Sequence, residues 1–173
     1  ALGYAQYLPR EQFLHTTEQM IDEMCMAFGG RAAEELVFGK ISTGALSDLE
    51  RITKMAYSMV TIYGMNKQIG NISFYDPQRS EYSVGKPYSE AMAEKIDMEV
   101  QKLLDHTYKR TIDLLTEKRE ELEILAQELL EKEVLFQKDL SKMIGPRPFD
   151  TPTGHLDESS NGNGHHEEKS DSE

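Results

Sequence analysis

The segment STGALSDLERITKMAYSMVTIYG (residues 42–64) begins with a Thr-Gly turn and continues as a run with helical apolar spacing. Ser47 and Glu50 have the spacing of a capping box, which predicts that a helix begins at Ser47. Gly64 predicts the end of that helix, because glycine readily takes the left-handed conformation found at helix C-termini. The apolar positions predict one buried stripe, made of Leu49, Ile52, Ala56, Met59, Val60 and Tyr63.

Asp48 lies in the first turn of this predicted helix. An acid there complements the helix dipole, a gain of about 0.3–1 kcal/mol, and spacing alone favours that interpretation over a binding role. Glu34 and Glu35 lie in the preceding helix beside an apolar face, where a solvated surface or a salt bridge with Arg31 is the ordinary interpretation. The residue pattern by itself therefore assigns no chemistry to these acids.

The preceding segment also has helical spacing. Thr16 and Gln19 form a capping box, and five apolar or sulfur-containing residues follow at three- and four-residue intervals: Met20, Ile21, Met24, Cys25 and Phe28. The helix is expected to continue through Gly29-Gly30 and to end near Gly39. A glycine pair costs about 1 kcal/mol per residue inside a helix, so we expect the helix of residues 47–63 to pack closely against it.

Residues 66–87 are rich in turn formers and allow at most a short strand at residues 71–75. Ser89 is expected to open a long helix, Thr116 a further one, and residues 137–144 a last short helix closed by Gly145-Pro146. Near the start, LGYAQYL (residues 2–8) alternates weakly and predicts a short strand that stops at Pro9.

The bulk composition excludes several classes of protein. The chain has 173 residues and a net charge of −12, which argues against a nucleic-acid partner. Its single cysteine, Cys25, excludes an intrachain disulfide framework. There is no signal-peptide pattern, and no apolar run approaches the roughly 20 residues needed to span a bilayer. The chain begins with Ala1 and not with Met, so we expect it to be a piece of a longer protein.

The composition changes at Asp150. Residues 150–173 hold seven acidic residues against one basic one and no aromatic residue, which predicts a disordered acidic tail after a folded part of residues 1–149. The tail carries half of the net charge. It also holds His165-His166, a pair that we interpret as solvated, although such a pair could bind a metal adventitiously.

The chain lacks the common catalytic motifs. GxxxxGK[ST], GxSxG and HExxH are all absent. Of the five histidines three lie in the tail, while His15 precedes a helix cap and His106 lies on the polar flank of a long helix. One open alternative is a non-catalytic helical interaction or oligomerisation module, in which residues 89–131 form the partner-binding surface.

GGRAAEELVFG (residues 29–39) followed by STGALSDLERITKMAYSMVTIYGM (residues 42–65) resembles the peptidase domain of the FtsH family, which are membrane-anchored AAA+ zinc proteases with mitochondrial m-AAA and i-AAA relatives. The resemblance runs from Leu2 to Phe149, through LGYAQYLP, KPYSEAMAEKIDMEV, LLEKEVL and GPRPF. It implies a mainly α-helical zinc-peptidase domain with a short N-terminal strand, long C-terminal helices and a disordered tail.

The resemblance also implies functional residues. In that family a HExxH helix supplies two zinc histidines and the catalytic glutamate, and an aspartate matching Asp48 is the third Zn²⁺ ligand. Such a carboxylate is expected to be held by backbone N–H groups at the helix start. Glu34 is expected to orient a ligand histidine. The strand residues Gly3, Tyr4, Ala5, Gln6 and Tyr7 match an edge strand to which an extended substrate adds by main-chain hydrogen bonds.

This chain departs from the family because the HExxH helix is missing, so the fragment alone is expected to be inactive. The resemblance implies that this helix, an AAA+ module that binds ATP and Mg²⁺, and membrane segments all lie upstream. It further implies a homo-hexamer that degrades unfolded proteins. The expected location is the bacterial inner membrane, with the peptidase on the cytoplasmic side, or alternatively the mitochondrial inner membrane, with the peptidase on the matrix side.

Overall fold

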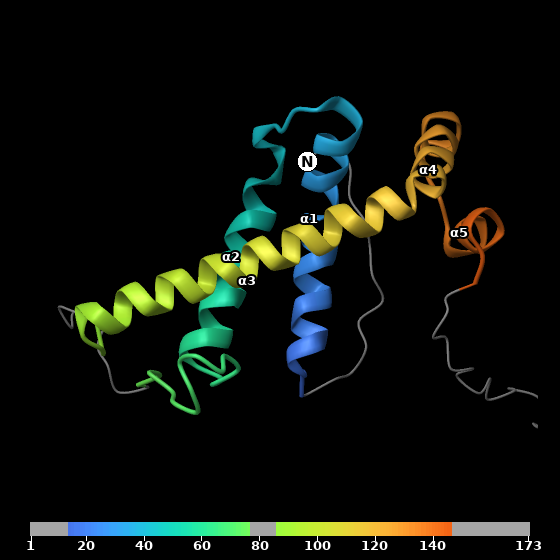
Figure 1. Ribbon diagram of the computed structural model, residues 1–173. Coiled ribbons are helices and arrows are strands. Elements are labelled where there is room, and N and C mark those ends of the chain that lie inside the picture. The colour runs from blue at the N-terminus through green and yellow to red at the C-terminus, as the bar shows by residue number, and fades with distance from the viewer. Residues whose placement is uncertain (1–13, 77–85, 147–173) are drawn as a thin grey trace, which may run out of the picture. The chain divides into compact units, whose positions relative to one another are not determined.

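The computed structural model describes residues 14–76 and 86–146, and it divides the chain into two compact units, residues 1–122 and 123–173 (Figure 1). The described residues form five α-helices and one short 3-10 helix, with no strand among them. The elements are α1 (Thr17–Phe38), η1 (Thr43–Ala45), α2 (Leu46–Thr61), α3 (Glu90–Glu117), α4 (Arg119–Lys132) and α5 (Gln137–Ile144). The mainly α-helical prediction is therefore confirmed. The predicted strand of residues 2–8 and the acidic tail lie outside the described residues.

The predicted capping box at the start of α1 is present. The backbone N–H of Gln19 donates to Thr16 Oγ1 over 3.3 Å, and the N–H of Thr16 donates to Gln19 Oε1 over 2.8 Å. These bonds satisfy donors that the first helical turn leaves without intrahelical partners. At the other end Gly39 takes the left-handed conformation with φ 61°, as expected for a helix C-terminus.

The predicted start of α2 is wrong. The helix begins at Leu46, and its N-cap is Ala45, which makes no side-chain capping bond, so Ser47 lies inside the first turn. The physical reason is η1, which already winds the chain before Leu46 and is capped by Ser42. Ser47 therefore never takes the extended backbone conformation that a capping residue needs. The helix ends at Thr61, and Gly64 follows with φ 63° in the left-handed conformation.

The remaining helices follow the predicted boundaries with one exception, and one expected strand is not formed. Ser89 caps α3 by accepting the N–H of Met92 over 3.3 Å, and α5 covers residues 137–144, both as expected. α4 begins at Arg119, three residues later than expected. The short strand expected at residues 71–75 is not formed: the N–H of Ile72 bonds to the carbonyl of Gly70 at 2.9 Å and that of Phe74 to the carbonyl of Thr61 at 2.8 Å, which make a turn and a single loop contact and no strand ladder.

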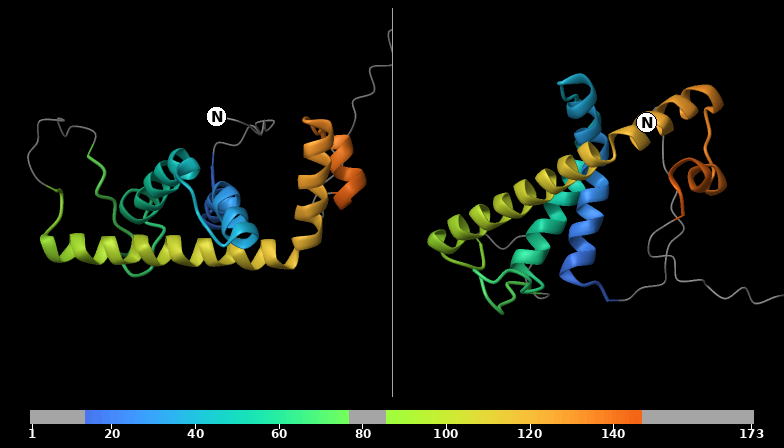
Figure 2. Two further views of the ribbon diagram at one scale, coloured as in Figure 1. Left: turned by 90° about the horizontal axis from the view of Figure 1, so that it is seen from above. Right: turned by 45° about the vertical axis from the view of Figure 1, so that its right-hand side comes forward.

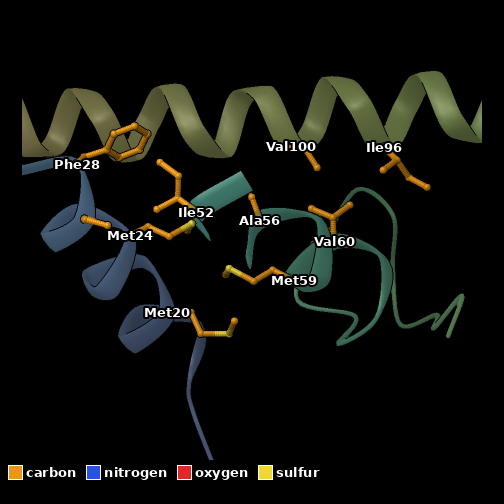
Figure 3. Close-up of a cluster of buried hydrophobic side chains, with 10 residues drawn as sticks. Met20, Met24, Phe28, Ile52, Ala56, Met59, Val60, Ile96 and Val100 are labelled. Carbon is orange, nitrogen blue, oxygen red and sulfur yellow. The ribbon is translucent and has the colours of Figure 1, made fainter. Parts of the chain in front are cut away.

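α1 and α2 lie side by side on one face of α3 (Figure 2). Their contact surfaces form one apolar core, in which Ile96 and Val100 of α3 approach Ala56 and Val60 of α2 (Figure 3). The buried residues of this core are Met20, Met24, Ala27, Phe28, Ile52, Ala56, Met59, Val60, Ile96 and Val100. The stripe of buried residues predicted for α2 is wrong at one residue. Tyr63 is 57% exposed, because it lies beyond the end of the helix.

The glycine pair of α1 does not lie under another helix. A Cβ added at Gly29 or Gly30 would meet no atom within 4 Å, and Gly30 is exposed, so the predicted close packing of α2 there is wrong. Helix geometry gives the reason. Phe28 and Ala32 are four residues apart and share the buried face, whereas Gly30 lies about 200° around the helix from Phe28.

Residues 123–146 differ from the α1–α3 unit in having no buried side chain, and several of their large apolar residues are exposed: Ile124, Leu129, Leu130, Val134, Phe136, Leu140 and Ile144. Among the helices of the described ranges, none is long and apolar enough to cross a membrane.

Candidate functional site

Asp48 is the third residue of α2, and its side chain points into solvent. Within residues 14–76 and 86–146 its carboxylate makes no hydrogen bond or ion pair. The expected bond from a backbone N–H at the helix start is therefore not formed among these residues. Both oxygens remain available, and a carboxylate oxygen is a ligand that zinc accepts.

Glu34, from the last part of α1, reaches across the connecting loop to Ser42. The backbone N–H of Ser42 donates to Glu34 Oε2 over 3.0 Å, and its hydroxyl donates to Oε1 over 2.8 Å and Oε2 over 3.1 Å. The hydroxyl and backbone bonds from Ser42, together with the positive charge of Arg31, hold the pKa of Glu34 below its ordinary value. Both carboxylate oxygens are engaged by one residue.

Ser42 also makes a hydrogen bond to the turn that precedes α2. Its Oγ accepts the N–H of Gly44 over 3.2 Å, which caps η1. η1 runs directly into α2, so Glu34, Ser42 and the turn that leads to Asp48 form one connected structure. We call these hydrogen bonds between Glu34, Ser42 and Gly44 the Ser42 clamp. Sequence reasoning missed it, and the one available signal was a serine before a Thr-Gly turn.

The neighbouring acid, Glu35, has a different partner. It accepts a hydrogen bond from the hydroxyl of Tyr108 on α3, and the ring of Tyr108 meets Phe28 edge to face at 5.0 Å between centroids. Burial, followed by the bond to Glu35, raises the pKa of Tyr108 to about 12. Glu34 and Glu35 thus each hydrogen-bond to another element, while Glu35 stays exposed and Glu34 partly exposed near the charge of Arg31, so the surface interpretation holds in part.

The histidines of the described ranges do not assemble around Asp48. His15 precedes α1 and His106 lies on α3, both exposed, and no group of three His, Cys, Asp or Glu side chains in residues 14–76 and 86–146 could hold a metal. His155, His165 and His166 lie outside these ranges, as do Gly3, Tyr4, Ala5, Gln6 and Tyr7. Asp48 therefore has no pair of further metal-binding side chains beside it among the described residues.

An open depression of about 410 Å³ runs along the first turns of α2, on a face that does not include Asp48. It is lined by Leu46, Leu49, Glu50, Thr53 and Lys54. Leu46 is 64% exposed, so this face of the first turn of α2 presents apolar surface.

Comparison with known proteins assigns the class. Residues 1–143 match peptidase family M41, so the chain belongs to that family. It is 55% identical over 151 residues to the ATP-dependent zinc metalloprotease FtsH of Rhodothermus marinus, a match that covers 86% of this chain and 22% of the relative.

Two mitochondrial proteins are similarly close. The mitochondrial inner membrane m-AAA protease component AFG3L1 of Mus musculus is 53% identical over 148 residues, covering 86% of this chain and 19% of the relative. The mitochondrial ATP-dependent zinc metalloprotease FTSH 3 of Oryza sativa subsp. japonica is 46% identical over 173 residues, covering 94% and 21%. The chain therefore spans about a fifth of the length of these relatives. The FtsH resemblance of the sequence is confirmed.

Proposed function

We propose that this chain is part of an ATP-dependent, membrane-anchored zinc metalloprotease that processively degrades unfolded or misassembled membrane and soluble proteins. The observation that carries the proposal is the family match over residues 1–143, joined to the exposed carboxylate of Asp48 in the first turn of α2. The relatives named ATP-dependent zinc metalloproteases support the same activity.

In this proposal Asp48 is the third Zn²⁺ ligand, and the two histidines and the catalytic glutamate come from a HExxH helix outside this chain. Zinc, when bound, polarises the scissile carbonyl and lowers the pKa of water. The residues of this chain supply the Asp48 carboxylate and form part of the wall of the site. Glu34 supports a zinc ligand without contacting the ion itself. An extended substrate adds by main-chain hydrogen bonds to an edge strand formed by Gly3, Tyr4, Ala5, Gln6 and Tyr7.

The domain assignment goes with this function. Residues 1–149 form part of the peptidase domain and residues 150–173 an acidic tail. The whole protein assembles as a homo-hexamer, binds ATP and Mg²⁺ in an AAA+ module, and takes unfolded proteins as substrates. The relatives include a bacterial FtsH and a mitochondrial inner membrane protease, which supports an inner-membrane location in a bacterium or a mitochondrion.

Asp48→Asn in the full-length protein tests the assignment. Asparagine keeps the shape of the side chain but removes the charge that binds the cation, so proteolysis and bound zinc should fall by orders of magnitude while ATP hydrolysis persists. Glu34→Gln should give a smaller loss, about 10–100-fold. Casein degradation, ATPase rate and zinc content are measured on the same preparations. A variant at Asp48 that keeps both zinc and protease rate returns this residue to a helix-dipole role.

The isolated chain offers a second test. A fragment ending at Phe149 supplies one carboxylate and should bind no stoichiometric zinc with high affinity in titration calorimetry. Tight binding by this fragment would mean that His15 or His106 joins Asp48 in a site of a different kind.

A further inference from the structure

The Ser42 clamp engages both oxygens of the Glu34 carboxylate. Two donors of Ser42 reach Glu34: its N–H at 3.0 Å from Oε2, and its hydroxyl, whose one proton is shared between Oε1 at 2.8 Å and Oε2 at 3.1 Å. A serine hydroxyl has one proton to donate and lone pairs that accept, so Ser42 can bond Glu34 and Gly44 at the same time. Glu34 is therefore committed to the loop in front of α2.

The segment between Ser42 and Asp48 has little else to hold it. Thr43, Gly44, Leu46 and Ser47 are all exposed, and no residue of η1 is buried. Apolar burial of α2 begins at Leu49, which is partly buried, and becomes complete only at Ile52. The direction of the first turn of α2, and with it the Asp48 side chain, therefore depends on polar contacts that precede the helix.

We propose that Ser42 is a positioning residue for Asp48, and that Glu34 acts on the zinc site through Ser42. Glu34 holds Ser42, Ser42 caps η1, and η1 sets where the first turn of α2 begins. This inference rests on the proposed role of Asp48 as a zinc ligand. It differs from a role of Glu34 in orienting a ligand histidine, because the two routes predict different couplings between Glu34 and Ser42.

The experiment compares four variants of the full-length protein: Ser42→Ala, Ser42→Thr, Glu34→Gln and the double variant Ser42→Ala/Glu34→Gln. The readouts are the rate of zinc loss to a chelator, kcat and KM for a peptide substrate, and the ATPase rate. Ser47→Ala is the matched control, since Ser47 is an exposed serine of the first turn of α2 that makes no hydrogen bond within the described ranges.

Ser42→Ala should speed zinc loss and lower kcat about 10–100-fold with little change in KM, as residues that orient metal ligands do. Ser42→Thr keeps the hydroxyl and should restore most of the rate. Ser47→Ala should stay within about twofold of the unaltered protein. The double variant should be no worse than the more severe single variant, because both changes break the same contact.

Additive losses in the double variant would overturn the proposal, since Glu34 would then act on the site by a separate route. Failure of Ser42→Thr to rescue, with ATPase activity intact, would also overturn it. Asp48→Asn is carried in the same series. If Asp48→Asn loses zinc and Ser42→Ala does not, only the positioning role fails; if Asp48→Asn keeps its zinc, the proposed function itself fails.

Discussion

The two ends of α2 are held in place by different kinds of interaction. At the N-terminal end, exposed residues form the Ser42 clamp, and the Asp48 carboxylate is left without a hydrogen bond among the described residues. At the C-terminal end Met59 and Val60 are buried against α1 and α3, with Met65, Ile69 and Phe74 of the following loop packed around them. Burial therefore holds the C-terminal end, whereas the turn before the N-terminal end is exposed and is held mainly by hydrogen bonds.

The C-terminal end of α2 also has polar contacts, and these are hydrogen bonds that Asn66 makes with other groups of the protein. Asn66 accepts the N–H groups of Gln68 and Ile69 and donates to Glu99 Oε2 over 3.1 Å. Hydrogen bonds from Lys102 and then Asn66 hold the pKa of Glu99, which is 9% exposed, below its ordinary value. The comparison teaches that α2 is buried most completely away from Asp48, whereas the first turn of the helix is exposed among the described residues.

The largest effect on stability is expected in the buried part of α2. Ile52 is 1% exposed, and Ile52→Ala should lower the free energy of unfolding by about 2–5 kcal/mol through lost burial and a residual cavity. Leu46→Ala at the exposed end is the control and should change it by about 0.5 kcal/mol or less. Urea unfolding of the chain measures both. Equal losses in the free energy of unfolding for the two variants would contradict the difference in burial between the two positions.

A smaller loss is expected at the loop after α2. Asn66→Ala leaves the N–H groups of Gln68 and Ile69 without their side-chain acceptor and should cost about 1–3 kcal/mol. Asn71→Ala is the control, because Asn71 is exposed and makes no side-chain hydrogen bond within the described ranges. Thermal melts followed by circular dichroism compare the two, and indistinguishable melting temperatures would contradict the role of Asn66.

Gly30 lies on an exposed face of α1, away from both ends of α2, and a substitution there tests this face. Gly30→Ala should stabilise the chain by about 0.5–1 kcal/mol, because a Cβ there meets open space and alanine favours a helix. Gly64→Ala should do the opposite and cost about 1–2 kcal/mol, since Gly64 has a left-handed backbone with φ 63°. A destabilising Gly30→Ala would mean that another part of the protein packs on this face.

The smallest effect concerns the Ser42 clamp in acid. Because the folded-state pKa of Glu34 is lowered, the clamp stabilises the fold fully above the ordinary pKa of a glutamate and is lost as the pH falls through the lowered value. The difference in melting temperature between the chain and Ser42→Ala should therefore be larger at about pH 7 than at about pH 3. In a Glu34→Gln background this pH dependence should disappear; its persistence would assign it to another acid.

Much of the helical architecture was predictable because the signals are local. The capping box of Thr16 and Gln19, the cap at Ser89 and the bounds of α5 depend on residues within one turn, and all three predictions are confirmed. The apolar spacing of α2 also identified Ile52, Ala56, Met59 and Val60 as buried. The family resemblance, and with it Asp48 as the candidate ligand, likewise came from the sequence.

Tertiary structure decided what local spacing leaves open. Ser47 and Glu50 have the spacing of a capping box, yet α2 starts from Ala45 without a side-chain cap, because η1, capped by Ser42, winds the chain earlier and Glu34 of α1 holds Ser42 in place. Gly30 was expected under a helix, but the face of α1 that meets α2 and α3 is set by Phe28 and Ala32. Hydrogen bonds within one turn are fixed by the chain itself, whereas contacts such as Glu34 with Ser42 form only when the connecting loop brings two elements together.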